Sequence, residues 1–394
     1  MAPRASSTAP IGGSTTHKEG RTILCVPKTS LTVTPPPKQP AFFNPAARLC
    51  RDLSILITHA WTRQLPGRIR VGDALAGVGA RAIRLAVEVP AVADVYVNDL
   101  NPETIEYASR TAILNGVQSK CHLSNLEACT FLAEHSRRGS RFDFVDIDPF
   151  GSPSPYIDCG LRAVKDGGLL SVTATDSTVL SGLYPGIALR RYFGLPLRTD
   201  YSKEIGARLL TGLIAREAAR LDLSTLPVFA HTDRVYTRVY ARIKYGAEEA
   251  NQSLNHLGYI NHCYSCNARH TSTNPVGTCT CGSPMKSAGP LWIGGLQAEQ
   301  LLQAIVESLP TDEQPAVRSV IERAIEETRM PASYFLLDKE ASKSRMAPPR
   351  MRSVLETLRA EGYRASRTVF SSKGFRTDAP PHIIPKILQR ASAS

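Results

Sequence analysis

The stretch IRVGDALAGVG, residues 69–79, runs from a strand-like segment into a glycine-containing loop, and an Ala-rich helical segment follows it up to Glu88. Glycines in such a loop let a ligand approach the backbone closely between a strand and a helix. Further strand-like segments at residues 94–97, 142–147 and 169–175 alternate with helical ones. This alternation predicts an α/β fold whose parallel sheet is covered by helices.

Acidic side chains end the first two predicted strands. Asp73 stands at the mouth of the glycine loop, and Asp99 ends the next strand, 26 residues further along the chain. A carboxylate in the place of Asp99 can accept both hydroxyls of a ribose, which predicts an adenosine-type cofactor. The third glycine of the dinucleotide motif is replaced by Ala82. Because a pyrophosphate disfavours a carboxylate at the start of the helix, Asp73 favours the cationic S-adenosylmethionine over NAD.

A later strand-like segment ends in DIDPFGS, residues 146–152. Carboxylates are costly to bury without a partner, so we interpret this strand end as an active site. Asp148 can accept an N–H of an exocyclic amino group and direct the nitrogen lone pair toward a methyl donor. Pro149 gives a rigid turn, and Phe150 can stack on the base. Asp146 either shares this catalytic work or holds the cofactor, and the work itself is positioning and electrostatic stabilisation.

The charge balance indicates a polyanionic partner. Lys and Arg number 47 against 35 Asp and Glu, a net charge of +12, and nucleic acid is the usual partner of such a surplus. The sequence has no run of the roughly 18 to 20 apolar residues that a membrane span needs, and no apolar signal segment near its start. We therefore expect a cytoplasmic monomer that makes no membrane contact.

Basic residues gather toward the C-terminus, where residues 338–376 hold ten of them against four acids. A predicted helix at 350–361 precedes a predicted strand, turn and strand at 367–377, which resembles a small winged nucleic-acid-binding module. Eight residues are candidates for phosphate contacts, although each could equally be a solvated surface charge. They are Arg198, Lys203, Arg208, Arg350, Arg364, Arg367, Lys373 and Arg376.

The nine cysteines form two sets. Four of them lie within nineteen positions, a spacing that can close a tetrahedral zinc site: Cys263, Cys266, Cys279 and Cys281. Without a secretion signal, a metal site is favoured over a disulfide framework. One residue separates the second pair where two are usual, and His262 and His270 are alternative ligands. The scattered cysteines are predicted to be small buried residues: Cys25, Cys50, Cys121, Cys129 and Cys159.

The chain resembles the tRNA (guanine-26-N2)-dimethyltransferase family of class I S-adenosylmethionine-dependent RNA methyltransferases. The resemblance extends from about Glu19 to Thr377. It is carried by Glu19-Gly20, Phe43-Asn44-Pro45, Arg51-Asp52-Leu53-Ser54, residues 73–77, Asn98-Asp99-Leu100-Asn101-Pro102, residues 146–152, residues 164–170, residues 173–176, Pro196-Leu197-Arg198-Thr199 and Gly289-Pro290-Leu291-Trp292.

The resemblance implies a Rossmann-like domain with a seven-stranded sheet and a smaller α+β C-terminal domain that holds the cysteine knot. It implies methyl transfer to the exocyclic N2 of guanine 26 in tRNA, giving N2-methyl- and N2,N2-dimethylguanosine. Together with the glycine loop, it gives an expected cofactor-binding set: Arg51, Asp73, Gly77, Arg81, Asp99, Glu127 and Ala128. The expected substrate contacts are Phe43, Asn44 and Pro149. Glu127 stands where the family pattern has a shorter Asp.

The expected organisation has three parts. Residues 1–16, rich in Ala, Ser, Thr, Gly and Pro, are predicted to be a disordered tail. The methyltransferase domain is expected at 17–246, because the alternating residues 234–244 predict its last strand. Residues 247–394 are expected to form the tRNA-binding domain.

Other functions compete with this hypothesis. One is an amino methyltransferase acting on another RNA or DNA base, and another is a non-catalytic tRNA-binding protein on a methyltransferase scaffold. Intact Asp73, Asp99 and Asp148 argue against the non-catalytic alternative. An NAD oxidoreductase is disfavoured by Asp73 and by the lack of a His or Tyr constellation for hydride transfer.

Overall fold

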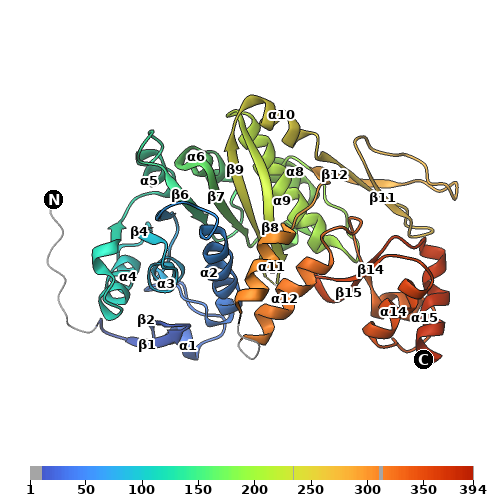
Figure 1. Cartoon of the computed structure of the whole chain (residues 1–394), viewed down its shortest axis with the longest axis horizontal. Coiled ribbons are helices and arrows are strands. Elements are labelled where there is room, and N and C mark those ends of the chain that lie inside the picture. Colours follow the sequence, from blue (N-terminus) through green and yellow to red (C-terminus); the bar gives the residue numbers. More distant parts are fainter. Residues whose placement is uncertain (1–10, 234, 310–313, 394) are drawn as a thin grey trace. The chain divides into compact units, whose positions relative to one another are not determined.

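The computed structural model describes residues 11–233, 235–309 and 314–393 of the chain (Figure 1). These residues form two compact units. The first contains residues up to 149 together with 155–172 and 307–317, and the second contains 150–154, 173–306 and the residues from 318 onward. The expected domain boundary at residue 246 stays a prediction.

A mixed sheet of seven strands in the order β5-β4-β3-β6-β7-β9-β8 confirms the predicted fold class. The pairs from β5 to β7 are parallel, and β8 and β9 are antiparallel. The strands are β3 (Ile69–Asp73), β4 (Val92–Asn98), β5 (Cys121–Ser124), β6 (Phe142–Ile147), β7 (Val164–Ala174), β8 (Leu223–Thr232) and β9 (Thr237–Tyr245). From β3 the chain adds β4 and β5 on one side of this strand and then crosses to add β6 and β7 on its other side. In open α/β sheets ligands bind at such a switch point, outside the carboxyl ends of the strands.

The helices of the first unit begin and end at signals that the sequence carries. Gly79 adopts a left-handed conformation immediately before α3, and the Asn101 side chain accepts the backbone N–H of Glu103 at the start of α4. Gly116, with φ of 66°, follows the end of α4. These helices are α1 (Thr29–Thr32), α2 (Arg48–Thr62), α3 (Ala80–Glu88), α4 (Pro102–Leu114), α5 (Ala128–Glu134) and α6 (Ile157–Ala163).

A hairpin of β1 (Ser14–Glu19) and β2 (Thr22–Pro27) begins the described chain. Its first strand starts inside the segment expected to be a disordered tail. The expectation was therefore wrong for residues 14–16, because backbone pairing with β2 orders polar residues that have no apolar pattern of their own. Residues 1–10 of the expected tail lie outside the described residues.

The second unit has mixed α and β structure, and its helix α9 packs against β8, β9 and β12 (Figure 1). Two three-stranded sheets have the orders β11-β10-β12 and β13-β15-β14. Their strands are β10 (Leu257–His262), β11 (Arg269–Ser272), β12 (Lys286–Trp292), β13 (Phe335–Leu336), β14 (Ala365–Thr368) and β15 (Ser371–Thr377). The other helices are α7 (Ser177–Leu180), α8 (Pro185–Tyr192), α9 (Ser202–Ala219), α10 (Ala247–Leu254), α11 (Glu299–Ser308), α12 (Pro315–Glu326), α13 (Leu337–Lys343), α14 (Met351–Ala360) and α15 (Ile384–Ala393).

Three strand predictions need correction. Residues 371–374 belong to β15 rather than to a turn, so the connection from β14 is the pair Val369-Phe370. Likewise β7 starts at Val164, five residues before the predicted strand at 169–175, with a register shift against β6. The last strand begins at Thr237 rather than at 234, and both faces of its first five residues are buried, because tertiary packing covers both sides of this part of β9.

The prediction for the scattered cysteines was wrong in part. Cys25 and Cys50 are buried thiols as expected. However, Cys129 of α5 and Cys159 of α6 form a disulfide, and Cys121 is only partly buried. Thirty positions separate the bonded pair, so only the packing of α5 on α6 brings them together. Among the described residues, none of the helices has the length and apolar character that crossing a membrane requires.

Candidate active site and metal centre

Three carboxylates and one arginine meet at the carboxyl ends of β3 and β6. Asp73 and Asp146 are register partners on the two parallel strands, and both are buried. Arg81, from the first turn of α3, donates from Nη1 to Asp146 Oδ2 at 2.5 Å and contacts Asp148 Oδ2 through Nη2 at 2.7 Å. Asp148 is the more open of these two acids, with 28% of its side chain exposed. Arg81 therefore fixes both aspartates of the DIDPFGS segment.

Asp73 has an unusual electrostatic environment. Burial raises the pKa of the Asp73 carboxyl well above its usual value, and the negative charge of Asp146 raises this pKa further. The positive charge of Arg81 offsets only part of the effect. The Oδ1 atom of Asp73 is buried and accepts no hydrogen bond from the described residues. Since a buried polar atom without a partner is costly, this oxygen is suited to a cationic ligand group.

The glycine loop between β3 and α3 is held by Asp99. Asp99 Oδ2 accepts the backbone N–H of Gly77 at 2.9 Å, and Oδ1 accepts that of Asn101 at 2.9 Å. Gly77 has φ of 55°, and a Cβ atom there would lie 3.3 Å from the carbonyl oxygen of Phe42. Glycine is therefore required at this position. Each Asp99 oxygen keeps a second lone pair, so the predicted contacts with ribose hydroxyls are compatible with these bonds.

Asn98 organises the same loops, and sequence reasoning missed it. Its Nδ2 donates to the carbonyl oxygens of Ala74 and Leu126, and its Oδ1 accepts from Ser124 Oγ and the backbone N–H of Leu126. The side chain is fully buried and joins the ends of β3, β4 and β5. An amide residue that ends an apolar strand was the available signal, because a buried amide must be hydrogen-bonded.

Arg51 is also paired within the protein. It donates from Nε and Nη2 to the two carboxylate oxygens of Glu19, at 2.7 and 2.5 Å, and from Nη2 to the Asn44 carbonyl oxygen at 3.0 Å. Glu19 is fully buried at the end of β1, and Arg84 also contacts it at 3.3 Å. Glu19 therefore fixes Arg51. The predicted contact of Arg51 with a cofactor carboxylate stays a prediction, as does that of Arg81, whose Nη atoms face Asp146 and Asp148.

Phe43 is buried and does not have the open position that a substrate contact requires, whereas the predicted contact of the partly buried Asn44 stays a prediction. Phe43 is 2% exposed and packs in the core of the first unit with Leu24 and Val26, while the Arg51 guanidinium lies 4.8 Å from its ring centroid. The Asn44 side chain accepts the backbone N–H of Ala46. An aromatic residue in a loop suggests an exposed ring, but long-range packing decides its burial.

The remaining predicted residues lie after β5 and β6. Glu127 is exposed, and its carboxylate accepts the backbone N–H of Thr130 at 2.9 Å at the start of α5, so its observed role is a helix cap. Ala128 is buried as the first residue of that helix. Pro149 is buried, whereas Phe150 is 58% exposed. The exposed ring two residues after Asp148 suits the predicted stacking on a base.

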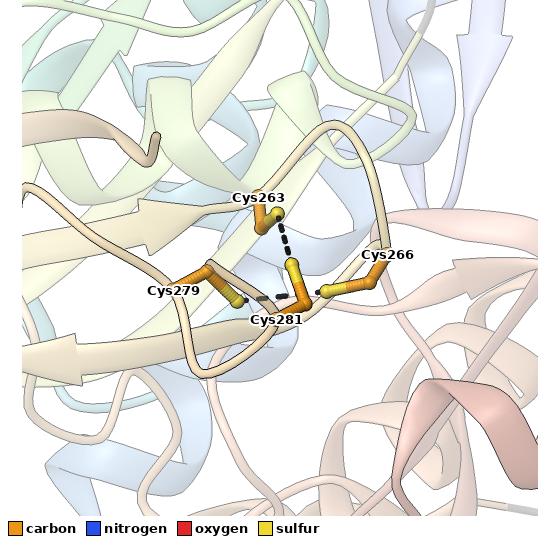
Figure 2. Close-up of side chains that lie close together, drawn as sticks. All are labelled: Cys263, Cys266, Cys279 and Cys281. Carbon is orange, nitrogen blue, oxygen red and sulfur yellow. Dashed lines mark hydrogen bonds between the residues drawn. The ribbon is translucent and has the colours of Figure 1, made fainter. Parts of the chain in front are cut away.

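The four clustered cysteines point toward one another from two loops (Figure 2). Their Sγ atoms all lie within 4.8 Å of one another, and the pairs Cys263–Cys281 and Cys266–Cys279 are 3.6 and 3.5 Å apart. Zn–S bonds of about 2.3 Å at tetrahedral angles place sulfurs a little under 4 Å apart. The cluster is therefore compatible with a structural zinc ion, and the single residue between Cys279 and Cys281 does not prevent the geometry.

Hydrogen bonds favour the thiolate form of two cysteines in this cluster, whereas desolvation and the neighbouring thiols raise the pKa of Cys266 to about 12. The backbone N–H of Cys266 lowers the pKa of Cys263, and that of Ser283 lowers the pKa of Cys281 to about 6. The neighbouring His262 instead lies beside Tyr201, with Nδ1 3.2 Å from its hydroxyl. Neither this histidine nor His270 belongs to the group of candidate ligands.

The predicted phosphate contacts divide by burial. Arg208 and Arg376 are buried and both contact Glu204, while Arg376 also contacts Glu327 at 2.8 Å. Those two predictions were wrong, because the side chains neutralise buried acids instead of facing solvent. Arg364, Arg367 and Lys373 form ion pairs on or near the surface. The residues that are exposed and have no ion pair within the described parts of the chain are Arg198, Lys203 and Arg350.

The sheet order and the acids at the ends of β3, β4 and β6 define a Rossmann-like, class I methyltransferase. The model of the N2,N2-dimethylguanosine tRNA methyltransferase family matches residues 20–389, and the chain belongs to this family. A tRNA (guanine(26)-N(2))-dimethyltransferase of Methanothermobacter thermautotrophicus is 34% identical over 381 residues, covering 95% of this chain and 98% of the relative. A tRNA (guanine(26)-N(2)/guanine(27)-N(2))-dimethyltransferase of Aquifex aeolicus is 32% identical and covers 92% of each chain.

A solved structure agrees with the relatives. Trm1 from Pyrococcus horikoshii, in complex with S-adenosyl-L-methionine, has a TM-score of 0.81 and 28% sequence identity to this chain. The match covers 95% of this chain and 99% of Trm1. The similarity therefore includes both compact units and not the sheet alone.

Proposed function

We propose that this protein transfers methyl groups from S-adenosylmethionine to the exocyclic N2 of guanine 26 in tRNA, giving N2-methyl- and N2,N2-dimethylguanosine. The observation that carries the proposal is the Asp148 carboxylate, held by Arg81 at the end of β6 and followed by the exposed ring of Phe150. Family membership supplies the nucleoside and the tRNA. The net charge of +12 favours the same polyanion.

The residues around the glycine loop fit the cofactor. Asp73 Oδ1 offers a buried negative partner to the amino group, and Asp99 faces the ribose. Gly77 allows close approach to the backbone. Bound S-adenosylmethionine supplies an electrophilic methyl group. Its positive charge also offsets the excess of carboxylates that raises the pKa of Asp73.

The protein's part in the chemistry is positioning. The guanine N2 is a weak nucleophile because its lone pair is delocalised into the ring. Asp148 accepts a hydrogen bond from an N–H of this amino group and keeps the nitrogen lone pair directed at the methyl group, while Phe150 stacks on the base. The proton that N2 loses when it gains the methyl group passes to the Asp148 carboxylate. The ion pair with Arg81 Nη2 keeps the Asp148 carboxylate oriented toward the substrate. Asp146 in turn holds Arg81 in place through its Nη1 atom.

The other parts of the proposal concern the surroundings of this site. The cysteine cluster holds a structural zinc ion, and residues 247–394 bind tRNA beside a methyltransferase domain at 17–246. We further propose a monomer that works in the cytoplasm on tRNA.

The direct test is methylation of an unmodified tRNA transcript. After incubation with S-adenosylmethionine, digestion and mass spectrometry should reveal N2-methyl- and N2,N2-dimethylguanosine, and a transcript with adenine at position 26 should yield neither. Asp148→Ala should lower the rate by about 100-fold or more, a typical loss for a group that positions and stabilises the reacting atoms. The matched control is Asp158→Ala, because Asp158 is an exposed aspartate on α6 that pairs only with Arg162 among the residues described.

The outcomes separate the competing functions. Methylation at a different base supports a related amino methyltransferase. Tight tRNA binding with no methylated product supports a non-catalytic scaffold. Full activity of Asp148→Ala contradicts the assigned chemistry even if the product is the expected one.

A further inference from the structure

Helix α8 carries apolar side chains that the fold does not bury. Leu183, Tyr184, Leu189 and Phe193 are each between 47% and 52% exposed, and we call these four residues the α8 face. On the helix itself only Ala188 and Tyr192 are buried. Single exposed apolar residues are ordinary, but four within eleven consecutive positions around one short helix are unusual, and exposed apolar groups of this kind often mark a binding surface.

The backbone at Phe193 is a second, independent sign. Phe193 ends α8 with φ of 50° and ψ of 33°, in the left-handed region. For a bulky residue this conformation is rare and costs about 1 to 2 kcal/mol. Glycine tolerates this conformation without cost, but the glycine of this segment, Gly194, lies one residue further along. Because half of the ring is exposed, packing does not repay this cost. An unfavourable backbone that presents an aromatic ring to solvent indicates function rather than stability.

Charge around the α8 face identifies the chemistry of its partner. Residues 177–199 contain three arginines and no acidic residue. Arg191 pairs with Asp176 at 3.1 Å, whereas Arg190 and Arg198 are exposed and make no ion pair with the described residues. Arg198 also lines an open hollow of about 1160 Å³ in the second unit. Aromatic rings interleaved with free arginines are the usual surface for unstacked bases and their phosphates.

Hydrogen bonds connect helix α8 to the loop that follows the catalytic aspartate. Tyr192, the last residue of α8, donates its hydroxyl proton to Asp176 at 2.5 Å. The adjacent Thr175 donates its backbone N–H to the carbonyl oxygen of Gly151, and the Gly151 N–H is 2.6 Å from Thr175 Oγ1. Gly151 directly follows Phe150 in the chain. The α8 face is thus fixed to the segment that carries the stacking ring.

We propose that the α8 face binds the nucleotides that flank the target guanine, with Tyr184 and Phe193 stacking on their bases while Arg190 and Arg198 contact phosphates. The inference rests on the proposed function, since an enzyme that reacts at a guanine amino group must take that base out of its stack. The neighbouring bases then lose their stacking partner, and aromatic side chains replace it. The α8 face is thereby a positioning surface for tRNA.

The first test compares tRNA and cofactor binding in matched variants. Tyr184→Ala and Phe193→Ala should each weaken the Kd for unmodified tRNA by roughly 5- to 100-fold, the usual range for one base–aromatic stack. The Kd for S-adenosylmethionine, measured by calorimetry, should not change. The control is Leu226→Ala, since Leu226 on β8 is similarly exposed at 44%. At saturating protein, a tRNA carrying 2-aminopurine next to position 26 should fluoresce more strongly with the variants than with the wild type, because stacking on an aromatic ring quenches this base.

Phe193→Gly separates binding from stability. Glycine relieves the left-handed backbone, so the melting temperature should stay within about 2 °C of the wild type or rise, while tRNA binding still weakens. Phe193→Trp should retain tRNA affinity because it keeps an aromatic ring. A ring with a structural role would instead show a lower melting temperature in Phe193→Gly.

The result that overturns the inference is wild-type tRNA affinity in Tyr184→Ala and Phe193→Ala. The inference is also overturned if these variants change only the oligomeric state measured by light scattering, because the α8 face then contacts a second copy of the chain rather than tRNA. Failure of the proposed function is distinguishable: the wild type then yields no methylated guanosine at all. Methylation by the wild type with unchanged tRNA binding in the variants contradicts the α8 proposal alone.

Discussion

Asp73→Asn should make the cofactor-free protein more stable at neutral pH and make it a poorer binder of S-adenosylmethionine. The folded protein raises the pKa of Asp73 because the carboxyl is buried and Asp146 is its register partner. Asparagine has nearly the same shape but never ionises. The substitution therefore removes the electrostatic cost of the folded state and, with it, the negative charge that a cationic cofactor needs.

The pH dependence has a definite sign and slope. Below the ordinary pKa of aspartate the carboxyl is protonated in both the folded and the unfolded chain. Above it, the unfolded chain releases the proton while the folded chain retains it, so the wild type loses stability relative to the variant as pH rises. One proton corresponds to about 1.4 kcal/mol per pH unit, which is the slope of the gap inside this window. The gap stops growing above the raised pKa.

The effect on binding is estimated from the loss of one partner of a buried charge pair. Such a loss costs about 2 to 5 kcal/mol, which weakens the Kd for S-adenosylmethionine by roughly 30-fold or more. Wild-type binding below the raised pKa should also release a proton, since the cation favours the ionised carboxylate. Calorimetry in buffers of different ionisation enthalpy measures both the Kd and this proton release.

Urea unfolding from pH 5 to pH 8 measures the stability gap, with Asp94→Asn as the control. Asp94 is partly exposed and pairs with His122 at 2.9 Å away from the carboxylates of the site, so its variant should bind S-adenosylmethionine like the wild type. The reasoning fails if Asp73→Asn binds S-adenosylmethionine within threefold of the wild type. It also fails if the stability gap does not change with pH.

Two further predictions concern the second unit. Cys263→Ser/Cys266→Ser should reduce bound zinc from about one ion per chain to none in metal analysis, because two of four thiolate ligands are lost, and unchanged zinc content would contradict the site. Arg376→Ala should destabilise the protein by about 3 to 5 kcal/mol in urea unfolding, because it removes the arginine that pairs with buried Glu327 and one of the two arginines that pair with buried Glu204. Lys373→Ala, which removes an exposed ion pair, should cost no more than about 1 kcal/mol, and equal losses in both variants would refute the distinction.

Much of the site's framework could be predicted from local sequence. The apolar runs that end in Asp73, Asp99 and Asp146 were sufficient, because parallel strands bring their carboxyl ends to one edge of the sheet. The start of helix α4 is encoded locally, by Asn101 and the proline after it, because capping depends on a few adjacent residues. The cysteine spacing likewise predicted the group that the fold assembles.

The partners of the charged residues could not be predicted in this way. Arg81 and Asp146 are 65 positions apart, and Glu204 and Arg376 are 172 positions apart. Nothing in the local pattern distinguishes a buried arginine that neutralises an acid from an exposed one that meets a phosphate. For the same reason the sequence did not show that Phe43, predicted to contact the substrate, packs in a core.

The sequence by itself determined the parallel sheet, the acidic strand ends and the four-cysteine group, because each follows from short-range periodicity or spacing. Only the tertiary structure decided that Arg81 fixes both aspartates of the DIDPFGS segment and that Asp73 carries a raised pKa. It also decided that the α8 face remains open beside free arginines. Burial and charge pairing depend on segments that are distant in the chain and meet only when it folds.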